Sequence, residues 1–259
     1  MTPNKARQTV GYAAAALIAV ERIDKVNSHI WRYMDLAKFI HVLATKTLHF
    51  TRIDQFKDKF EGSYPIQNLR DWELQYPEVG NFSHWRKFAC VSCWYESDNE
   101  SAAMWELYGK DNQGLAIQST KERLKKSVES DEVTFDKVKY VNFIKEKADI
   151  HIPLDVFLYK RTEFECEREY RAALFDLPKS DGTQNGFPNF GSVEKQEGYP
   201  KVGKDISVDL EILIEKIVLS PYAMPWYKKA VADVLMKYHI SGSILVESEL
   251  SSDPVYPRQ

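Results

Sequence analysis

Residues 88–94 read FACVSCW, a run in which six of the seven side chains are apolar and only Ser92 is polar. A continuous apolar run of this length is typical of a strand covered on both faces, so it predicts the central strand of a sheet. On either side of it in the sequence, residues 29–34 (HIWRYM), 47–52 (TLHFTR) and 115–119 (LAIQS) predict further strands. In residues 47–52 apolar and polar side chains alternate, as they do in a strand with one covered face.

Predicted helices lie between these strands. Asp35 can cap a helix that follows the first strand, Asn99 can cap a helix over residues 100–108, and Pro225 can begin a later one. The spacing of helices and strands is irregular, and several strands mix polar with apolar side chains. A doubly wound parallel sheet instead has uniformly apolar strands joined by regular helices. The pattern therefore predicts a single α+β domain over residues 29–259.

Size and charge limit the classes of function. The chain has 259 residues and a formal net charge of −3, from 35 Lys and Arg against 38 Asp and Glu. A chain of this size can bury a large core without disulfides or metal. The nearly balanced charge leaves no broad basic surface for a nucleic-acid backbone, so there is no strong nucleic-acid signature. Three cysteines cannot all pair, and we predict a reducing, cytoplasmic setting for them.

Two segments differ from the rest of the predicted domain. Residues 1–28 contain an apolar, alanine-rich run over residues 10–20, which is too short to span a bilayer. We expect an N-terminal helix here, packed on the domain or on a partner, with a signal peptide as the alternative. Residues 178–205 hold five of the eleven Gly and three of the eleven Pro, without sustained periodicity. They predict a long irregular loop, of the kind that forms lids, recognition loops or disordered insertions.

Common catalytic signatures are missing from the sequence. It has no Gly-x-Ser-x-Gly, no Walker loop and no Gly-x-Gly-x-x-Gly, and its six histidines form no paired metal-binding motif. Cys90 and Cys93 have the spacing of a metal or redox site. On a strand, however, residues three apart point to opposite faces and cannot chelate one ion. We therefore predict no metal site.

The segment ECEREYR, residues 165–171, is the strongest candidate for chemistry. It overlaps a long predicted strand over residues 166–175, which would place four charged side chains on one face: Glu165, Glu167, Glu169 and Arg171. Three carboxylates this close repel one another, which raises at least one pKa unless a cation or a ligand hydroxyl neutralises them. Two interpretations stay open, a carboxylate cluster that lines a cleft and a solvated outer face with a salt bridge.

A second group of candidates combines a hydroxyl with aromatic rings. Ser92 and Trp94 end the predicted central strand, while Trp105 and Tyr108 lie three residues apart on a predicted helix and so share a face. Packing in the core explains such residues, and so does the wall of a binding cleft. Trp and Tyr each carry a polar group that usually finds a partner, which suits both interpretations.

The order of several short motifs resembles that of one known family. The motifs are Trp31-Arg32-Tyr33-Met34, Leu48-His49-Phe50-Thr51-Arg52, residues 54–62, Ser92-Cys93-Trp94, Met104-Trp105-x-x-Tyr108, Tyr140, Lys160-Arg161, Glu167-x-Glu169-x-Arg171 and Val246-Glu247-Ser248-Glu249-Leu250. Over residues 29–254 this set resembles domain of unknown function 2971, a family found mainly in bacteria and their mobile elements. At one turn, residues 57–61 (KDKFE) depart from the family's usual Asn-Asp-Pro-Phe-Glu.

The arrangement also resembles, more distantly, that of the ADP-ribosyltransferases, with Arg on an early strand and Glu-x-Glu on a late one. This resemblance implies a mixed, mainly antiparallel and split sheet flanked by helices, with NAD as co-substrate bound without a Rossmann motif. It implies that Glu169 or Glu167 stabilises positive charge on the ribose, and that Ser92 holds a ribose or the carboxamide. Arg32 would pair with the pyrophosphate. The full set of implied nucleotide-binding residues is Arg32, Tyr33, Arg52, Trp94, Trp105, Tyr108 and Arg171.

Three functional hypotheses follow. The first is an NAD-consuming, ADP-ribosyltransferase-like enzyme, a bacterial toxin or phage-defence effector that acts on an unidentified acceptor macromolecule. The second is a non-catalytic module that binds a small molecule or a protein in an aromatic cleft. The third is a metal-dependent nuclease, because carboxylates alone can hold magnesium. None of the three involves a membrane partner.

Overall fold

The computed structural model describes residues 28–75, 86–109, 112–151, 153–175, 183–184, 187–188 and 202–254. Except for Ser28, the N-terminal helix predicted over residues 1–28 lies outside the described residues, as does most of the irregular segment predicted over residues 178–205. Of the helices that are described, none is long and apolar enough to cross a membrane.

Most strands form one mixed sheet, in the order β11-β2-β3-β1-β4-β12-β13, with β8 on the other edge of β3 and β5 beyond β8. These strands are β1 (His29–Asp35), β2 (Thr47–Arg52), β3 (Ala89–Glu96), β4 (Gly114–Thr120), β5 (Val133–Lys137), β8 (Glu169–Phe175), β11 (Gly203–Ser207), β12 (Lys216–Leu219) and β13 (Leu245–Val246). All pairs are antiparallel except β12 with β13. Two small sheets pair β6 (Lys139–Val141) with β7 (Tyr159–Arg161) and β9 (Thr183–Gln184) with β10 (Phe187–Pro188).

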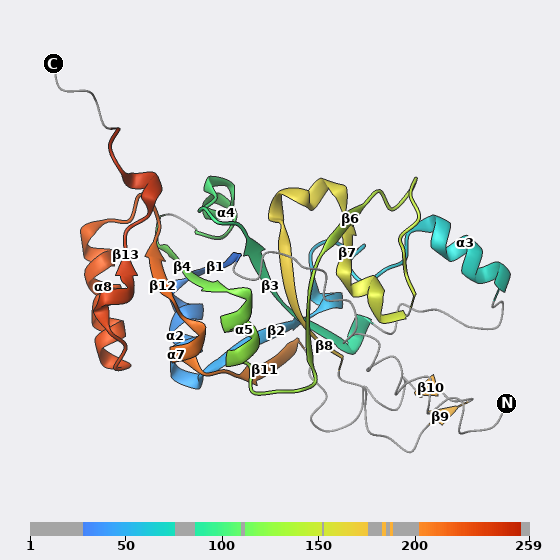
Figure 1. The fold of residues 1–259 in the computed structure, drawn as a ribbon, viewed down its shortest axis with the longest axis horizontal. Helices are drawn as coiled ribbons and strands as arrows, with labels where there is room; N and C mark the ends of the chain where they lie inside the picture. The colour runs from blue at the N-terminus through green and yellow to red at the C-terminus, as the bar shows by residue number, and fades with distance from the viewer. Residues whose placement is uncertain are drawn as a thin grey trace.

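Strand β3 is the centre of the sheet, as its apolar sequence predicts, and Figure 1 shows it beside β8 in the middle of the molecule. One edge of β3 pairs with β8 along most of its length. The other edge pairs with β2 at Cys90 and Val91, and then with β1 at Tyr95 and Glu96. Strands β1 and β2 thus share one edge of β3 and separate opposite residues 92–94. This separation makes the sheet a split one.

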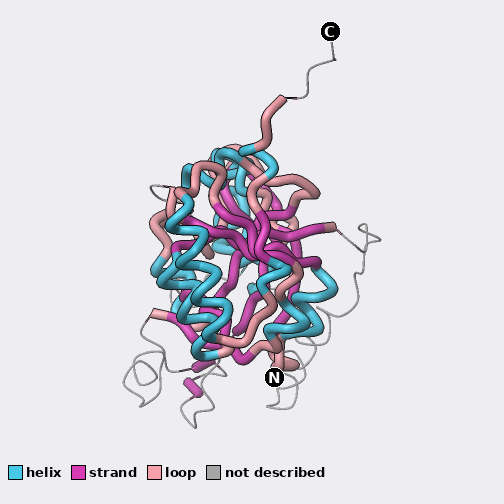
Figure 2. The backbone as a smooth tube through the Cα atoms, turned by 90° about the vertical axis from the view of Figure 1, so that its left-hand side faces the viewer, coloured by secondary structure: helices cyan, strands magenta, loops and turns pink. Residues whose placement is uncertain are grey.

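Helices cover both faces of the sheet, and Figure 2 shows the strands between them. One face holds the main core, in which Phe39, Leu124 and Val231 pack with strand residues such as Ile30 and Leu48. This face is covered by α2 (Leu36–Thr45), α5 (Lys121–Ser127), α7 (Leu210–Leu213) and α8 (Pro225–Lys237). The opposite face is covered by α4 (Ala102–Tyr108) and the 3-10 helix η3 (Pro153–Leu158).

The remaining helical segments lie away from the sheet or are single turns. Helix α3 (Ile66–Gln75) lies beyond β6 and β7 at one end of the molecule (Figure 1). The 3-10 turns are η1 (Ile53–Gln55), η4 (Thr162–Glu167), η5 (Gly242–Ile244) and η6 (Glu249–Ser251). The predicted fold class, α+β with a mixed and mainly antiparallel split sheet flanked by helices, is confirmed.

Two predicted boundaries are wrong. Helix α4 begins after Ser101 and not after Asn99, because the Ser101 hydroxyl accepts the Met104 N–H at 3.3 Å. The predicted irregular segment, residues 178–205, includes the start of a strand, because residues 203–207 pair with β2 as strand β11. Both corrections concern the ends of elements, where short polar residues offer more than one way to cap or to pair.

Candidate active site

A cleft of about 620 Å³ opens where β1 and β2 separate on one edge of β3. Side chains from β1, α2, β2, β3, α4 and the first residue of β8 line it. Cavities of this volume commonly hold small-molecule ligands and cofactors. The split in the sheet therefore creates a candidate ligand site, with residues from distant parts of the chain in its walls.

Arg32 of β1 bridges the split. Its Nη1 donates to the Ser92 hydroxyl on β3, and its Nη2 donates to the backbone oxygen of His49 on β2 at 3.1 Å. The guanidinium also lies 5.7 Å from the centre of the Trp94 ring. Burial lowers the pKa of Arg32, and among the described residues no carboxylate forms an ion pair with it. A guanidinium that lines a cleft without a counter-charge is suited to bind an anion.

Ser92 lies beneath Arg32 rather than in the wall of the cleft. Its side chain is buried, and its oxygen accepts hydrogen bonds from Arg32 and from Trp94 Nε1, the latter at 3.2 Å. Trp94 does line the cleft, beside Arg32. Ser92 is thus placed to orient the guanidinium.

Two of the three predicted carboxylates, Glu167 and Glu169, belong to a cluster of five charged side chains on one side of the cleft. Glu169 accepts from Lys160 Nζ at 2.5 Å and from Arg171 Nε at 2.7 Å. Lys160 also donates to Glu167 at 2.6 Å and lies 3.3 Å from Glu61. Arg171 Nη2 donates to both oxygens of Glu61, at 3.1 and 3.0 Å. Of these five side chains, Glu167 and Glu169 line the cleft.

Two neighbouring carboxyl groups have opposite pKa shifts in this cluster. Burial by itself would raise the pKa of Glu169, but Arg171 and Lys160 hold it well below its ordinary value. Burial and the hydrogen bond with Glu169 raise the pKa of Glu167 to about 7. Three carboxylates share two cations, so the carboxyl group that receives the fewest hydrogen bonds from these cations takes up the proton. Glu169 is therefore ionised, while Glu167 can carry a proton near neutral pH.

The charged strand face predicted over residues 165–171 is only partly correct. Residues 162–167 form η4, and Arg168 takes a left-handed conformation (φ 38°) before β8 begins at Glu169. A bond from Arg168 N–H to the Glu165 carbonyl, 3.1 Å long, closes this turn. Glu165 is exposed and takes no part in the cluster, while Glu167 reaches Glu169 from the helical turn. A solvated outer face is excluded for Glu169, which is only 4% exposed.

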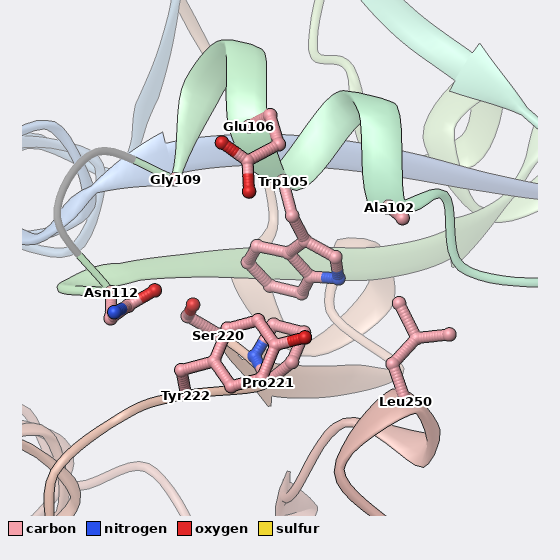
Figure 3. Close-up of a pocket in the computed structure, with 9 residues that line it drawn as sticks. All are labelled: Ala102, Trp105, Glu106, Gly109, Asn112, Ser220, Pro221, Tyr222 and Leu250. Atoms are coloured by element: carbon pink, nitrogen blue, oxygen red, sulfur yellow. The ribbon is translucent and has the colours of Figure 1, made fainter.

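The aromatic candidates divide between two pockets. Tyr33 and Tyr108 line the cleft, as Trp94 does. Trp105 instead points from α4 toward Pro221 and Tyr222, where it lines a separate pocket of about 100 Å³ (Figure 3). Its ring stands edge-on to Tyr33, with centres 4.7 Å apart. Trp105 thus supports the wall of the cleft from behind.

The other two arginines predicted to bind nucleotide do not line the cleft. Arg52 forms a two-pronged ion pair with Asp54, both bonds being 2.7 Å long. Arg171 is fully buried, and it donates to Phe157 O at 2.7 Å as well as to Glu169 and Glu61. Arg171 therefore holds Glu169 in place.

Sequence reasoning assigned no role to three residues at the carboxylate cluster. Glu61 and Lys160 belong to the cluster, and Tyr140 contacts it. The Tyr140 hydroxyl accepts the Glu169 N–H at 2.8 Å, and Glu61 is almost fully buried against Arg171. All three residues lie in motifs of the family resemblance, which marks positions without explaining them. Glu61 is more than one hundred residues from Glu169 in the sequence, so only the fold reveals their contact.

The cysteines are free thiols. Cys90 packs in the main core, while Cys93 lines the cleft, where burial raises the pKa of its thiol. The two side chains point to opposite faces of β3, as the strand prediction requires. Across the part of the chain that the structure describes, no group of three or more side chains could hold a metal ion.

Comparisons with known proteins give one family and two solved structures. The family model described as protein of unknown function (DUF2971) matches residues 104–172, which confirms the resemblance found in the sequence. Thermus sp. 2.9 DarT in complex with ADP-ribosylated ssDNA is similar in structure, at 9% identity and a TM-score of 0.41, over 89% of this chain and 98% of that one. Thermus sp. 2.9 DarT in complex with NAD+ is similar at 8% identity and the same TM-score, over 88% and 98%. None of the curated proteins compared with the chain matches it.

Proposed function

We propose that this protein is an NAD-consuming enzyme that transfers ADP-ribose to an acceptor macromolecule. The observation that carries this proposal is the charge pattern of one cleft, in which Arg32 has no carboxylate partner among the described residues and Glu169 is held ionised. NAD has two complementary features. Its pyrophosphate is an anion, and its ribose becomes positively charged as the bond to nicotinamide breaks.

Glu169 supplies the electrostatic part of the reaction. When the ribose–nicotinamide bond breaks, the electron pair stays on the nicotinamide ring nitrogen and the ribose becomes an oxocarbenium-like cation. A carboxylate that Lys160 and Arg171 already hold in place can stabilise this cation without reorganising. Glu167, whose pKa is about 7, can donate a hydrogen bond to the nucleotide or exchange a proton with it.

Arg32 and the aromatic residues supply the binding part. A guanidinium with unused N–H groups can bind the pyrophosphate, and Ser92 and His49 O fix its plane. Tyr108 lines the same cleft and is exposed, so it presents a ring on which the nicotinamide or the adenine can stack. Trp94 is fully buried, and its ring packs beside the Arg32 guanidinium. Because NAD is abundant inside cells, we place the activity in the cytoplasm, as that of a bacterial toxin or defence effector.

The test is the release of nicotinamide from NAD by the purified protein, measured by chromatography. We expect Glu169→Gln to lower the rate by a factor of about 100 to 1,000, the usual loss when one pre-organised electrostatic group is removed. Glu165→Gln is the matched control, because Glu165 lies four residues away, is exposed and takes no part in the cluster. Thermal unfolding of each variant shows whether the fold is kept.

Each other outcome indicates a different function. NAD binding without nicotinamide release would favour the non-catalytic binding module. Cleavage of a nucleic acid that requires magnesium and stops with a chelator would favour the nuclease. Equal rates for wild type and Glu169→Gln would contradict the role of Glu169.

A further inference from the structure

A histidine and an aspartate form a pair at the cleft, outside the cluster already described. His49 on β2 and Asp205 on β11 are direct partners in the antiparallel pairing of these strands. Their side chains meet, with Nδ1 of His49 2.7 Å from Oδ1 of Asp205. Both side chains are about two-fifths exposed, so the pair is open to solvent and to a large partner.

The pairing determines which nitrogen of His49 can act as a base. An ionised carboxylate only accepts hydrogen bonds, so Nδ1 carries the proton and Nε2 carries the lone pair. Nε2 has no hydrogen-bond partner among the described residues. Residue 203 is glycine, and a Cβ there would lie only 2.7 Å from Nε2. The glycine therefore lets the β11 backbone pack against the imidazole without a side chain that would collide with Nε2.

The same histidine is joined to the proposed nucleotide site. Its backbone oxygen accepts from Arg32 Nη2 at 3.1 Å, and His49 is among the residues that line the cleft, as Glu169 is. His41 also lines the cleft, but its Nε2 is 3.6 Å from Oδ2 of Asp205, which is too long for a hydrogen bond. His49 is thus the imidazole that Asp205 orients.

We propose that His49, oriented by Asp205, is the general base that activates the acceptor, an inference that rests on the proposed function. Its Nε2 takes the proton from an O–H or N–H group of the acceptor as that oxygen or nitrogen bonds to C1′ of the ribose. The C1′–N bond breaks, and neutral nicotinamide leaves with the electron pair. Asp205 stabilises the imidazolium until its proton passes to water. A base is needed only for an acceptor that arrives protonated, so the acceptor is a hydroxyl or an N–H group and not a carboxylate.

The experiment measures nicotinamide release from NAD with water as the acceptor, in the presence and absence of sodium azide. His49→Asn keeps an N–H donor for Asp205 and removes the base, so we expect release to fall by a factor of about 100. Azide carries no proton, so it should restore release and yield ADP-ribosyl azide. Asp205→Asn should show the same loss and rescue. His151→Asn is the control, because His151 pairs with Asp149 on the surface, at 3.2 Å, outside the cleft.

The outcomes separate this proposal from the one on which it rests. If wild type releases no nicotinamide, the proposed function itself fails and this inference fails with it. If wild type is active and His49→Asn is equally active, the base is not His49 and the proposed function stands. A loss that azide does not restore, while NAD still binds, would also overturn the base role, because it would show that His49 only positions other groups.

Discussion

Glu167 and Glu169 are two residues apart, yet their surroundings shift their pKa values in opposite directions. Glu169 receives hydrogen bonds from Lys160 and Arg171, whereas Glu167 receives one from Lys160 and shares a proton with Glu169. At neutral pH one group is therefore a fixed negative charge and the other can exchange a proton. Such a pair can serve two different steps of a reaction.

The raised pKa of Glu167 has a measurable effect on stability. In the unfolded chain Glu167 loses its proton near pH 4.5, and in the folded protein it keeps the proton until about pH 7. The folded state thus binds more protons between these values, and the stabilisation present below pH 4.5 is lost as pH rises through 7. We expect this to lower the free energy of unfolding by on the order of 3 kcal/mol, since the pKa moves from 4.5 to about 7 and one pKa unit corresponds to about 1.4 kcal/mol.

Urea unfolding across this pH range checks the prediction. Glu167→Gln cannot ionise, so its free energy of unfolding should lack this part of the pH dependence. Glu165→Gln, which changes an exposed carboxylate in the same turn, should keep the wild-type dependence. A Glu167→Gln profile parallel to that of wild type would show that Glu167 titrates normally.

Single residues of the site could be predicted from the sequence where their chemistry is local. The motif residues Arg32, Ser92 and Glu169 stood out by type and order, and Arg32 does line one cleft with Glu169 while bonding to Ser92. Glu61 and Lys160 could not be assigned, because their role exists only through contacts across the fold. A buried charge needs a partner, but the sequence does not say which distant residue supplies it.

Helix α4 has only seven residues, so its stability depends strongly on its N-terminal cap. The helix also carries Trp105 and Tyr108, which line the two pockets. The Ser101 hydroxyl accepts the Met104 N–H, so we expect Ser101→Ala to lower the free energy of unfolding by about 1 kcal/mol. Asn99, the cap expected from the sequence, is the matched control. Asn99→Ala should change stability by no more than a few tenths of a kcal/mol in denaturant unfolding, and the reverse ranking would contradict the observed cap.

Elements were predictable where a periodic pattern determines them and were not predictable where that pattern is misleading. Strand β3 follows from its continuous apolar run, and α2 follows from its Asp35 cap. Residues 162–167 form η4 although their charges alternate as on a strand. There Lys160 donates to both Glu167 and Glu169, and the alternation of charges in the sequence does not show this shared contact.

At the scale of the whole molecule, the split of the sheet is what creates the cleft. Strands β1 and β2 both pair with β3 on the same edge, and Arg32 of β1 bonds to β3 through Ser92 and to β2 through His49. Apolar patterns predict which strands exist. They do not show where two neighbours on one edge separate, because β1 and β2 each pair with β3 through contacts between distant parts of the chain. The split itself was expected only from the resemblance to a known layout.

A ligand that binds in the cleft between β1 and β2 should stabilise the whole molecule. We expect an NAD analogue with carbon in place of the ribosyl ring oxygen, which cannot release nicotinamide, to raise the Tm by about 5 to 10 °C at about 100-fold excess over its Kd. Arg32→Gln removes the group proposed to bind the pyrophosphate and should lose most of this shift. Arg70→Gln, on the exposed surface of α3 at one end of the molecule (Figure 1), should keep it. An equal shift in all three proteins would place the nucleotide away from Arg32, and no shift in wild type would contradict NAD as the ligand.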